Sequence, residues 1–464
     1  MTLLLLCLAA PACEFVRSTG PAGLPVAAIA VSPADATLAA GEAVQLHATV
    51  ADTGGSLLEN RLVTWSRTIT ATCESRSALA SITVTGSAPP PPPATSCPNP
   101  WPAAIYPRMP LSSGQAFYVS AQSGSDDNPG TLQAPWKSLQ KTFDALQPGQ
   151  IAYLRAGTYG AVCTASTFAR AGTAAAPITV QGYPGERPVL LGQIRLLGSY
   201  FRLMGVVVEG PSCCAWGAAT RQGENLVQMD PGTSHHIEVS NSEVFHGGWH
   251  AGIAAGGDDI WILGNYIHDN GGFNDPSQEN TSHGIYYHEG TRGVVANNIL
   301  EHNRAKGLSA RFSANHILVV NNTVVGNGRS GMDISENTHD WTFANNIVVN
   351  NGNVNGGVGI NTGGSSGGTS NAERHNIFWN NGTDGSSHWD ANATIVGNDV
   401  AYPLLVNATV STPSIAHQAY ANDLHVRPGS PAIDRADPAY ATPFDITGGC
   451  RVRGNGADLG AYER

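Results

Sequence analysis

Charged residues are scarce in this chain of 464 residues, where they make up 13% of the sequence, and the excess of acidic over basic side chains leaves a net charge of −11. No basic stretch is present, which argues against nucleic acid and anionic membranes as partners. No apolar run approaches the length of about 18 residues that a membrane-spanning helix needs. The eight cysteines are too few and too irregularly spaced for a disulfide scaffold or for a zinc site built from two CxxC pairs.

Glycine, by contrast, is abundant, with 54 residues, or about 12% of the chain against a usual ~7%. Few charges combined with many glycines and asparagines favour a β-rich repeat fold over long helices. The length allows two or three domains, or one long repeat array with an appendage. Composition divides the chain into four segments, residues 1–13, 25–86, 87–114 and 115–464.

The first twelve residues, MTLLLLCLAAPA, are a short apolar stretch that ends in small residues and precedes Cys13. This pattern resembles the end of a secretory signal without its positively charged start, and Cys13 is a candidate for lipid attachment. We interpret residues 1–13 as the remnant of an export or lipoprotein signal and expect a secreted or outer-surface protein of a bacterium. In an oxidising environment some cysteines are expected to pair. The candidates are Cys163, Cys213, Cys214 and Cys450.

Residues 25–86 alternate apolar and polar positions between Gly- and Asp-containing turns, which predicts a small β-sandwich. The stretches SPADATLAAGEAVQLHATV and LVTWS resemble bacterial Ig-like (group 2) domains. Two strands of such a domain are missing before TITATCESRSALASITV, so we expect an incomplete sandwich. Residues 87–114, which contain APPPPPAT, are interpreted as a stiff Pro-rich linker.

Residues 115–464 contain an internal repeat, in which an Asn recurs at intervals of 24, 33, 24, 24 and 30 residues and a second polar residue follows five residues later. The recurring residues are Asn241, Asn265, Asn298, Asn322, Asn346 and Asn376. Asn tolerates left-handed backbone and can form hydrogen-bonded ladders between stacked strands. A period of 24 residues suits one coil of a parallel β-helix, whose short strands stack about 4.8 Å apart around one core.

The two ends of this repeat region resemble secreted right-handed parallel β-helix proteins of the pectate-lyase-like superfamily. The similar segments are residues 117–131, 135–144, 151–159 and 177–186 at the start and residues 423–434 and 458–463 at the end. The resemblance implies an all-β, right-handed parallel β-helix. Leu139, Phe143 and Leu146 share one helical face, which predicts an N-terminal helix that caps the first coil. The superfamily includes lyases, hydrolases, epimerases and non-catalytic surface proteins, so the fold leaves the activity open.

Aligning the coils also aligns a second strand, in which an apolar residue follows a glycine in every coil. If this apolar column points inward, the residues two and four after the glycine point outward. The residues two after are Ala254, Tyr286, Ser309, Asp333 and Asn361, and those four after are Gly256, His288, Arg311, Ser335 and Gly363. We expect Tyr286, His288, Arg311 and Asp333 to form one patch about 10 Å long. His283 and Lys306 precede the glycine and flank this patch if the chain bends there.

The patch has the chemistry to cleave a uronate polymer by elimination, which needs one group to neutralise the carboxylate, one to remove the C5 proton and one to protonate O4. Arg311 suits the carboxylate. Lys306 is the candidate base, because the charge of Arg311 would lower its pKa, and Tyr286 or His288 is the candidate acid. His283 and Asp333 complete the predicted catalytic set. The predicted substrate-binding residues are Glu289, Ser309 and Glu336.

A metal is a further expectation. Asp275 and Glu279, in an insertion that leads into the patch, and Glu289 are candidate oxygen ligands for Ca²⁺, although no EF-hand-like spacing is present. Several lyase families of the superfamily use a Lys or Arg base with Ca²⁺ bridging the carboxylate, which the resemblance implies here. We expect no organic cofactor, an acidic polysaccharide as partner, and a monomer.

Two other functions stay open. A glycoside hydrolase would use Asp333 with Glu289 or Glu336, since an inverting mechanism needs two carboxyls about 6.5–9.5 Å apart. A non-catalytic carbohydrate-binding surface protein would agree with an Ig-like domain and a spacer. The remaining histidines are interpreted as surface or corner residues; they include His235, His236, His246, His250 and His268.

Overall fold

The chain forms two compact units, Met1–Ala94 and Thr95–Arg464. The computed structural model describes eight short strands of unit 1, residue 97, and residues 101–210, 225–247, 250–271, 281–352, 356–361, 370–382, 393–408 and 422–464. In this part of the chain, no helix has the length and apolar character that a bilayer crossing needs.

Unit 1 consists of short strands where it is described. The antiparallel sheet has the order β1 (Thr2–Leu5), β4 (Val44–Ala51), β2 (Ala28–Ser32). A second sheet contains β5 (Thr64–Trp65), β6 (Thr70–Cys73) and β7 (Arg76–Leu79), and β3 (Asp35–Leu38) pairs with β8 (Ser81–Val84). The Ig-like assignment stays a prediction. Cys13, Cys213, Cys214 and the proline run lie outside the described residues.

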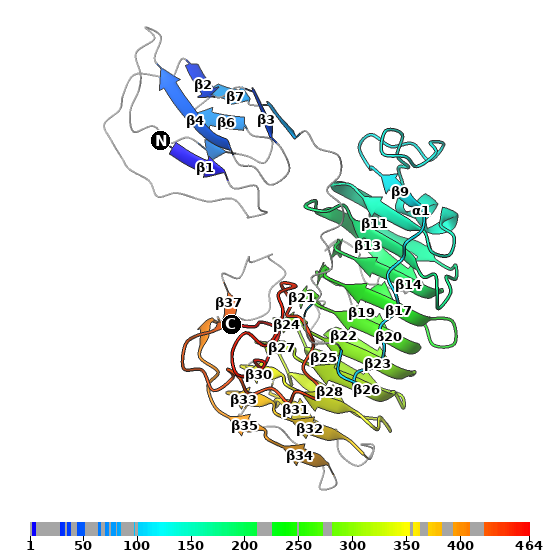
Figure 1. Cartoon of the computed structure of the whole chain (residues 1–464), viewed down its shortest axis with the longest axis vertical. Helices are drawn as coiled ribbons and strands as arrows, with labels where there is room; N and C mark the ends of the chain where they lie inside the picture. The colour runs from blue at the N-terminus through cyan, green and yellow to red at the C-terminus, as the bar shows by residue number, and fades with distance from the viewer. Residues whose placement is uncertain are drawn as a thin grey trace. The chain divides into compact units, whose positions relative to one another are not determined.

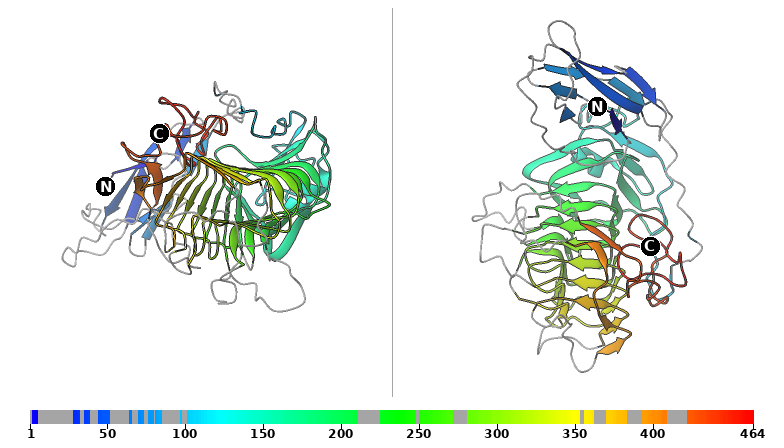
Figure 2. Two further views of the ribbon diagram at one scale, coloured as in Figure 1. Left: turned by 90° about the horizontal axis from the view of Figure 1, so that it is seen from below. Right: turned by 90° about the vertical axis from the view of Figure 1, so that its left-hand side faces the viewer.

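Unit 2 is a right-handed parallel β-helix, in which each coil contributes strands to three rows (Figures 1 and 2). Row A is an 11-stranded parallel sheet. It consists of β9 (Ala116–Val119), β10 (Ile151–Leu154), β12 (Ile178–Gly182), β14 (Ser199–Met204), β17 (His235–Ser240), β20 (Asp258–Leu263), β23 (Thr291–Ala296), β26 (Asn315–Val320), β29 (Thr342–Ala344), β32 (Ala372–Arg374) and β34 (Thr394–Val396).

Rows B and C are joined through the long strands β11 (Gly157–Phe168) and β13 (Pro188–Leu196). Row B continues with β15 (Val207–Glu209), β18 (Glu243–Phe245), β21 (Tyr266–His268), β24 (Ile299–Glu301), β27 (Thr323–Val325), β30 (Ile347–Val349), β33 (Ile377–Trp379) and β35 (Asp399–Val400). Row C continues with β16 (Asn225–Gln228), β19 (Ala251–Ala255), β22 (His283–His288), β25 (Leu308–Arg311), β28 (Met332–Ile334) and β31 (Ile360–Asn361). An antiparallel pair, β36 (Leu405–Asn407) and β37 (Asp423–Val426), follows.

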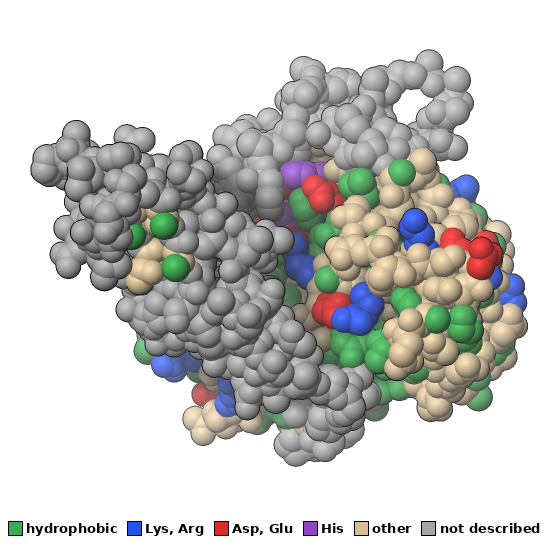
Figure 3. Space-filling model, turned by 90° about the horizontal axis from the view of Figure 1, so that it is seen from above, with side chains coloured by type: hydrophobic (Ala, Val, Ile, Leu, Met, Phe, Trp, Pro, Cys, Tyr) green, Lys and Arg blue, Asp and Glu red, His purple; other side chains and the backbone are tan. Residues whose placement is uncertain are grey.

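The core runs through the middle of the coils, as the repeat predicts. The apolar residue after each aligned glycine is fully buried, which confirms that this column points inward; its members are Ile253, Ile285, Leu308, Met332 and Ile360. Burial of this continuous apolar strip is the main stabilising term in such a repeat fold. On the outside, seen from above, acidic and basic side chains of the described residues lie next to each other rather than in a patch of one sign (Figure 3).

Two ladders of asparagine side chains follow the corners of the coils, which confirms that prediction. In each ladder, Nδ2 of one Asn donates to Oδ1 of the next at 2.8–3.1 Å. The first ladder is Asn265, Asn298, Asn322, Asn346, Asn376 and Asn398. The second is Asn270, Asn303, Asn327, Asn351 and Asn381. Each rung satisfies buried polar groups that the corner would otherwise leave without partners.

The alignment of Asn241 with the ladder was wrong by one residue. Glu243 pairs with Tyr266, so Ser242 occupies the ladder position, and its backbone N–H donates to Oδ1 of Asn265 at 3.0 Å. Asn241 has a φ of 49°, and Asn297 has a φ of 56°. The left-handed conformation therefore belongs to the residue before each rung, where Asn tolerates it.

Replacing Asn322 by alanine is expected to lower the free energy of unfolding by about 2–4 kcal/mol. Its Oδ1 accepts from the N–H and Nδ2 of Asn298, and its Nδ2 donates to the carbonyl of Val295 and to Asn346. Thermal and urea unfolding followed by circular dichroism measure the effect. The matched control is Asn241→Gly, which suits a positive φ and should change the stability by less than about 0.5 kcal/mol. Equal losses in both variants would contradict the ladder's contribution.

The predicted cap helix is α1 (Leu139–Ala145). Ser138 is its N-cap and accepts a hydrogen bond from the N–H of Lys141 at 3.1 Å. Leu139 and Phe143 are buried, and the ring of Phe143 meets Phe168 and Phe201 edge-on at 5.8 and 5.9 Å. The helix thus covers the apolar interior at the first coils, and the prediction of a capping helix at this position is confirmed.

Residues 101–112, which the sequence placed in a linker, pack on the outside of row A, and we call them the strap. The carboxylate of Glu238 (β17) accepts from Arg108 of the strap and lies 3.0 Å from Nε of Arg202 (β14). Arg202 also donates to the carbonyl of Met109 at 3.0 Å. Arg202 and Glu238 are fully buried. The prediction of a linker is wrong for residues 101–112, because this network and the apolar outer surface of row A bind them to the β-helix.

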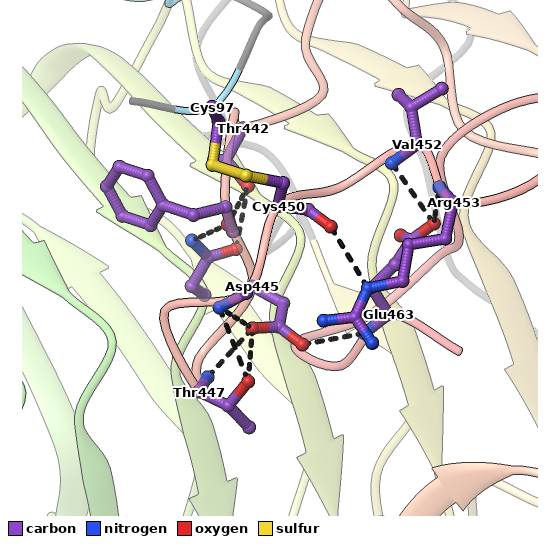
Figure 4. Close-up of a disulfide and its surroundings, with 11 residues drawn as sticks. Cys97, Thr442, Asp445, Thr447, Cys450, Val452, Arg453 and Glu463 are labelled. Carbon is purple, nitrogen blue, oxygen red and sulfur yellow. Dashed lines mark hydrogen bonds between the residues drawn. A yellow bond between two sulfur atoms is a disulfide. The ribbon is translucent and has the colours of Figure 1, made fainter. Parts of the chain in front are cut away.

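The C-terminal segment contacts the strap through Trp101 and Phe444, and the disulfide Cys97–Cys450 joins it to the chain before the strap begins (Figure 4). The ring of Trp101 meets Trp261 of row A and Phe444 of the C-terminal segment edge-on at 5.5 and 5.3 Å. Cys450 was a predicted disulfide candidate, whereas Cys97 was not. The disulfide therefore joins the C-terminal segment to the part of the chain that leads into the strap.

Asparagine side chains from the corner before the first ladder hold the C-terminal segment. Asn297 donates to the carbonyl of Phe444 at 2.8 Å, Asn321 accepts from the N–H of Thr442 at 3.1 Å, and Asn345 accepts from the N–H of Asp437 at 2.7 Å. The amides are spaced by one coil each, so the segment follows the axis of the β-helix.

Candidate functional site

The outward side of row C carries the predicted patch. Tyr286 pairs with Ser309 and Ser309 with Asp333 in neighbouring strands, while His288 pairs with Arg311. The predicted alignment of these columns is confirmed. We call the following set the candidate site: His283, Tyr286, His288, Lys306, Ser309, Arg311 and Asp333.

Lys306 lies just before β25, and its Nζ is 3.0 Å from Oδ2 of Asp333, with both side chains only 9% exposed. Asn361 donates to the same carboxylate oxygen at 3.0 Å. Asp333 belongs to the outward column, so the contact requires the bend before Gly307 that the sequence argument assumed. The amine of Lys306 therefore lies on the outward side of row C.

The environment of Lys306 lowers its pKa. Burial is the largest cause, the charges of Arg311 and Arg329 act in the same direction, and the charge of Asp333 and its hydrogen bond oppose them. Burial lowers the pKa of Lys306 more than the charge of Arg311, the cause expected from the sequence, because the uncharged amine is favoured away from water. A lysine with a lowered pKa can supply an uncharged amine, which is the form that accepts a proton.

Three imidazoles surround the ring of Tyr286. His250 meets it edge-on at 4.5 Å, and His283 and His288 lie roughly parallel to it at 5.8 and 5.3 Å. Burial lowers the pKa of His283 well below its usual value and that of His250 to about 4. Burial also raises the pKa of Tyr286 to about 12. The cluster is therefore held uncharged at neutral pH, with the phenol protonated.

Arg311 forms an ion pair with Glu336, and both side chains are partly exposed, at 36% and 37%. Glu289, a predicted substrate-binding residue, is exposed and has a φ of 55°. Exposed ion pairs contribute little to stability. The guanidinium can therefore exchange Glu336 for a carboxylate of a ligand at small cost.

Ser309, a predicted substrate-binding residue, is fully buried. Its Oγ, the Oγ of Ser335 and Nδ1 of His283 have no hydrogen-bond partner among the described residues. Buried polar atoms without a partner are costly and are rare away from functional sites. Ser309 shares its outward column with Tyr286 and Asp333, so an unpartnered hydroxyl lies in the same column as the groups that carry the predicted chemistry.

The described residues around Lys306 supply no set of ligands for a calcium ion. Asp333 is engaged with Lys306 and Asn361, and within the described ranges no group of three or more His, Cys, Asp or Glu side chains is placed to hold a metal. Asp275 and Glu279 lie outside the described residues.

Three residues of this face escaped the sequence argument or were set aside by it. His250 was interpreted as a surface residue, although it comes two residues before Gly252, close to the position of His283 before Gly284. Asn361 was aligned but given no role, and Arg329 was not considered. One signal for Lys306 was available: the chain has three lysines, and the other two, Lys137 and Lys141, lie at the cap helix.

Comparisons with known proteins agree with this architecture. Residues 117–241 match the family model described as Pel9A-like, right handed beta helix region, and residues 225–400 match a model described as Right handed beta helix region. The chain is thus a right-handed parallel β-helix protein. Pectate lyase PEL9 of Emericella nidulans is 36% identical over 91 residues, which are 20% of this chain and 21% of that protein. The chain therefore spans about a fifth of the length of that curated relative.

Two solved structures are similar in fold. The crystal structure of pectate lyase Pel9A aligns over 76% of this chain and 97% of its own, with a TM-score of 0.51 and 17% identity. A rhamnogalacturonan lyase aligns over 63% of this chain and 91% of its own, with a TM-score of 0.46 and 15% identity. At 17% identity the likeness to Pel9A concerns the fold alone.

Proposed function

We propose that this protein is a lyase that cleaves an acidic, uronate-containing polysaccharide by β-elimination at the candidate site. The observation that carries the proposal is the nearly buried Lys306, held by Asp333 on the outward side of row C beside the coil of Tyr286. The match of residues 117–241 to the Pel9A-like model, and the likeness to a relative named pectate lyase, support the same reaction class.

In the proposed reaction, Arg311 pairs with the carboxylate of a uronate, which makes its C5 proton more acidic. Uncharged Lys306 accepts that proton. The electron pair of the C5–H bond becomes the C4–C5 double bond while the C4–O4 bond breaks. A general acid protonates the departing O4. The products are an unsaturated uronide and a shortened chain, and no oxidant, reductant or water is consumed.

Tyr286 is the better candidate for the general acid. Its phenol stays protonated up to high pH because burial raises its pKa to about 12. Burial lowers the pKa of His288, so its ring is less often the charged acid. The three surrounding imidazoles fix the position of the phenol, which favours transfer of its proton to one defined oxygen.

A glycoside hydrolase on this face would use Asp333 with Glu289 or Glu336. Asp333 is bound by Lys306 and Asn361, and Glu336 is bound by Arg311. Because the lyase mechanism also requires Arg311 to leave Glu336, the product of the reaction, rather than these ion pairs, separates the two functions.

A substrate screen tests the proposal. The protein is incubated with alginate, pectate and glycosaminoglycans while the ultraviolet absorbance of the C4–C5 double bond is followed. Elimination predicts rising absorbance on at least one polymer. Reducing ends released without absorbance would indicate a hydrolase, and binding without turnover would indicate a carbohydrate-binding protein; either result overturns the proposal.

The pH dependence of cleavage should report the Lys306–Asp333 pair. The base must be uncharged, so the rate should rise with pH until Lys306 has lost its proton. Asp333 raises the pKa of Lys306, against burial and the charges of Arg311 and Arg329, and the neighbouring His283 is held neutral. Asp333→Asn should therefore shift the acidic limb of the profile to lower pH. Asp340→Asn, two residues before β29 of row A, is the matched control. A limb that stays in place or moves to higher pH would contradict the pairing.

Two expectations remain proposals. Calcium dependence is checked by activity after dialysis against a chelator and again after Ca²⁺ is added back. Export agrees with a polymeric substrate that lies outside the cell, and cell fractionation with mass spectrometry of Cys13 checks both export and lipid attachment.

A further inference from the structure

We infer that the outward side of row C carries a second subsite, centred on Arg195, that binds a uronate carboxylate of the same polymer several sugar units away from the bond that is cleaved. The inference rests on the proposed function. It follows from a register that extends beyond the patch expected from the sequence.

The outward column of the candidate site continues toward the cap helix. Arg195 (β13) pairs with Gln228 (β16), Gln228 pairs with Ala254 (β19), and Ala254 pairs with Tyr286. The residues before Arg195 and Gln228, Ile194 and Val227, are buried in the core. Since side chains alternate along a strand, Arg195 and Gln228 point to the same side as Tyr286. From Arg195 onward the column is Arg195, Gln228, Ala254, Tyr286, Ser309, Asp333 and Asn361, and Thr167 of β11 precedes it.

The spacing of the coils sets the distance between the two cations. With a rise of about 4.8 Å per coil, Arg195 lies about 14 Å from the coil of Tyr286 and about 19 Å from that of Arg311. One sugar unit of an extended polymer is about as long as one rise. A chain that follows the column and places one carboxylate at Arg311 thus brings another to Arg195 about four units away.

The side chains at this end form a prepared polar group. Arg195 contacts Oδ2 of Asp230 at 3.2 Å, and the two side chains are 40% and 35% exposed. Gln228 donates to the other oxygen of Asp230 at 2.6 Å, and the N–H of Asp230 donates to Ser234 at 2.9 Å. Asp230 thus orients Arg195 through one contact, and a guanidinium with five N–H donors can bind a second carboxylate at the same time.

The coil between the two polar groups contributes only short side chains to the outward columns, Ala254 and Gly256. A side chain at Gly256 would meet the carbonyl of Met229, Pro231 and His288 at 2.7–2.9 Å. Arg195 is therefore separated from the candidate site by a coil without polar side chains in these columns. This makes Arg195 a distinct subsite whose loss should leave the reacting groups intact.

Calorimetry with uronate oligomers of increasing length tests the subsite. The background is the Lys306→Gln variant, in which we expect turnover to be too slow to consume the oligomers during the measurement. Adding Arg195→Ala to this background should leave the affinity for trimers unchanged. It should weaken the affinity for hexamers and longer oligomers about 10-fold, as expected for the loss of one charge-assisted contact. The matched control is Arg292→Ala, an exposed arginine paired with Asp259 on row A, which should change neither affinity.

The outcomes separate the two proposals. Equal binding of long oligomers by Arg195→Ala and Arg292→Ala would overturn the subsite. So would an equal loss for trimers and hexamers, because a general effect on folding or on the candidate site does not depend on length. Length-dependent binding through Arg195, with no unsaturated product from the unmodified protein on any polymer, would support the subsite and overturn the lyase proposal alone.

Discussion

Replacing Lys306 by glutamine should lower the turnover number for elimination about 1,000-fold, the range measured for loss of a general base. Glutamine keeps a donor for the buried carboxylate of Asp333, so the fold and the ion-pair geometry are disturbed as little as possible. A second variant, Lys306→Arg, keeps the positive charge but cannot lose its proton near neutral pH. Both variants should be inactive and both should still bind oligomers. Initial rates of absorbance change, with circular dichroism as a folding check, measure this.

The matched control for Lys306 is Lys137, an exposed lysine beside the cap helix. Lys137→Gln should keep full activity. If Lys306→Gln, which has no side chain able to accept the proton, keeps more than about a tenth of the rate, the role of Lys306 as the base is refuted. If all three variants are equally active, the reaction takes place elsewhere on the molecule.

Glu238→Gln should cost about 3–5 kcal/mol of unfolding free energy, because it leaves Arg202 as a buried charge without its carboxylate. Glu238 is fully buried between Arg202 and Arg108 of the strap. Burial alone would raise the pKa of Glu238, but the charge of Arg108 and the hydrogen bonds lower this pKa to about 2. Its stabilisation is thus complete above the ordinary pKa of 4.5 and is lost as the pH falls toward 2.

Urea unfolding at neutral and acidic pH tests this account of the strap. The free energy of unfolding of the unmodified protein should fall between about pH 4.5 and 2. It should fall less for Glu238→Gln, because this variant lacks the stabilisation by the Glu238 carboxylate at every pH. Glu186→Gln, which affects a partly exposed pair with Arg155, is the control and should cost less than about 1 kcal/mol. If Glu238→Gln leaves the free energy of unfolding unchanged, contacts other than those of Glu238 hold the strap.

The repeat was predictable from the sequence because it depends on local spacing. Each coil contributes the same apolar position after a glycine, and this position alone determines which residues share the outward column with Tyr286 and Asp333. The error at Asn241 has a local reason: Ser242 occupies the ladder position in that coil, and a serine has no amide to continue the pattern. With the alignment corrected by one residue, Asn241 occupies the corner position with a positive φ instead of the ladder position.

The contacts that depend on distant segments could not be read from the sequence. Arg108 and Glu238 are 130 positions apart, and the two cysteines of the disulfide are 353 apart. No spacing rule connects such residues. The ion pairs of the candidate site could not be read from the sequence either. The sequence indicated that Lys306 and Arg311 lie close together. It did not indicate that Asp333 pairs with Lys306 or that Glu336 pairs with Arg311.

A crystal structure of the Lys306→Gln variant with a bound uronate oligomer tests the central claim most directly. We predict the oligomer along row C, with one carboxylate on Arg311, the C5 hydrogen of that unit facing residue 306, and the adjoining O4 within reach of Tyr286. An oligomer bound to row A or row B, or one on row C whose C5 hydrogen faces away from residue 306, would contradict it.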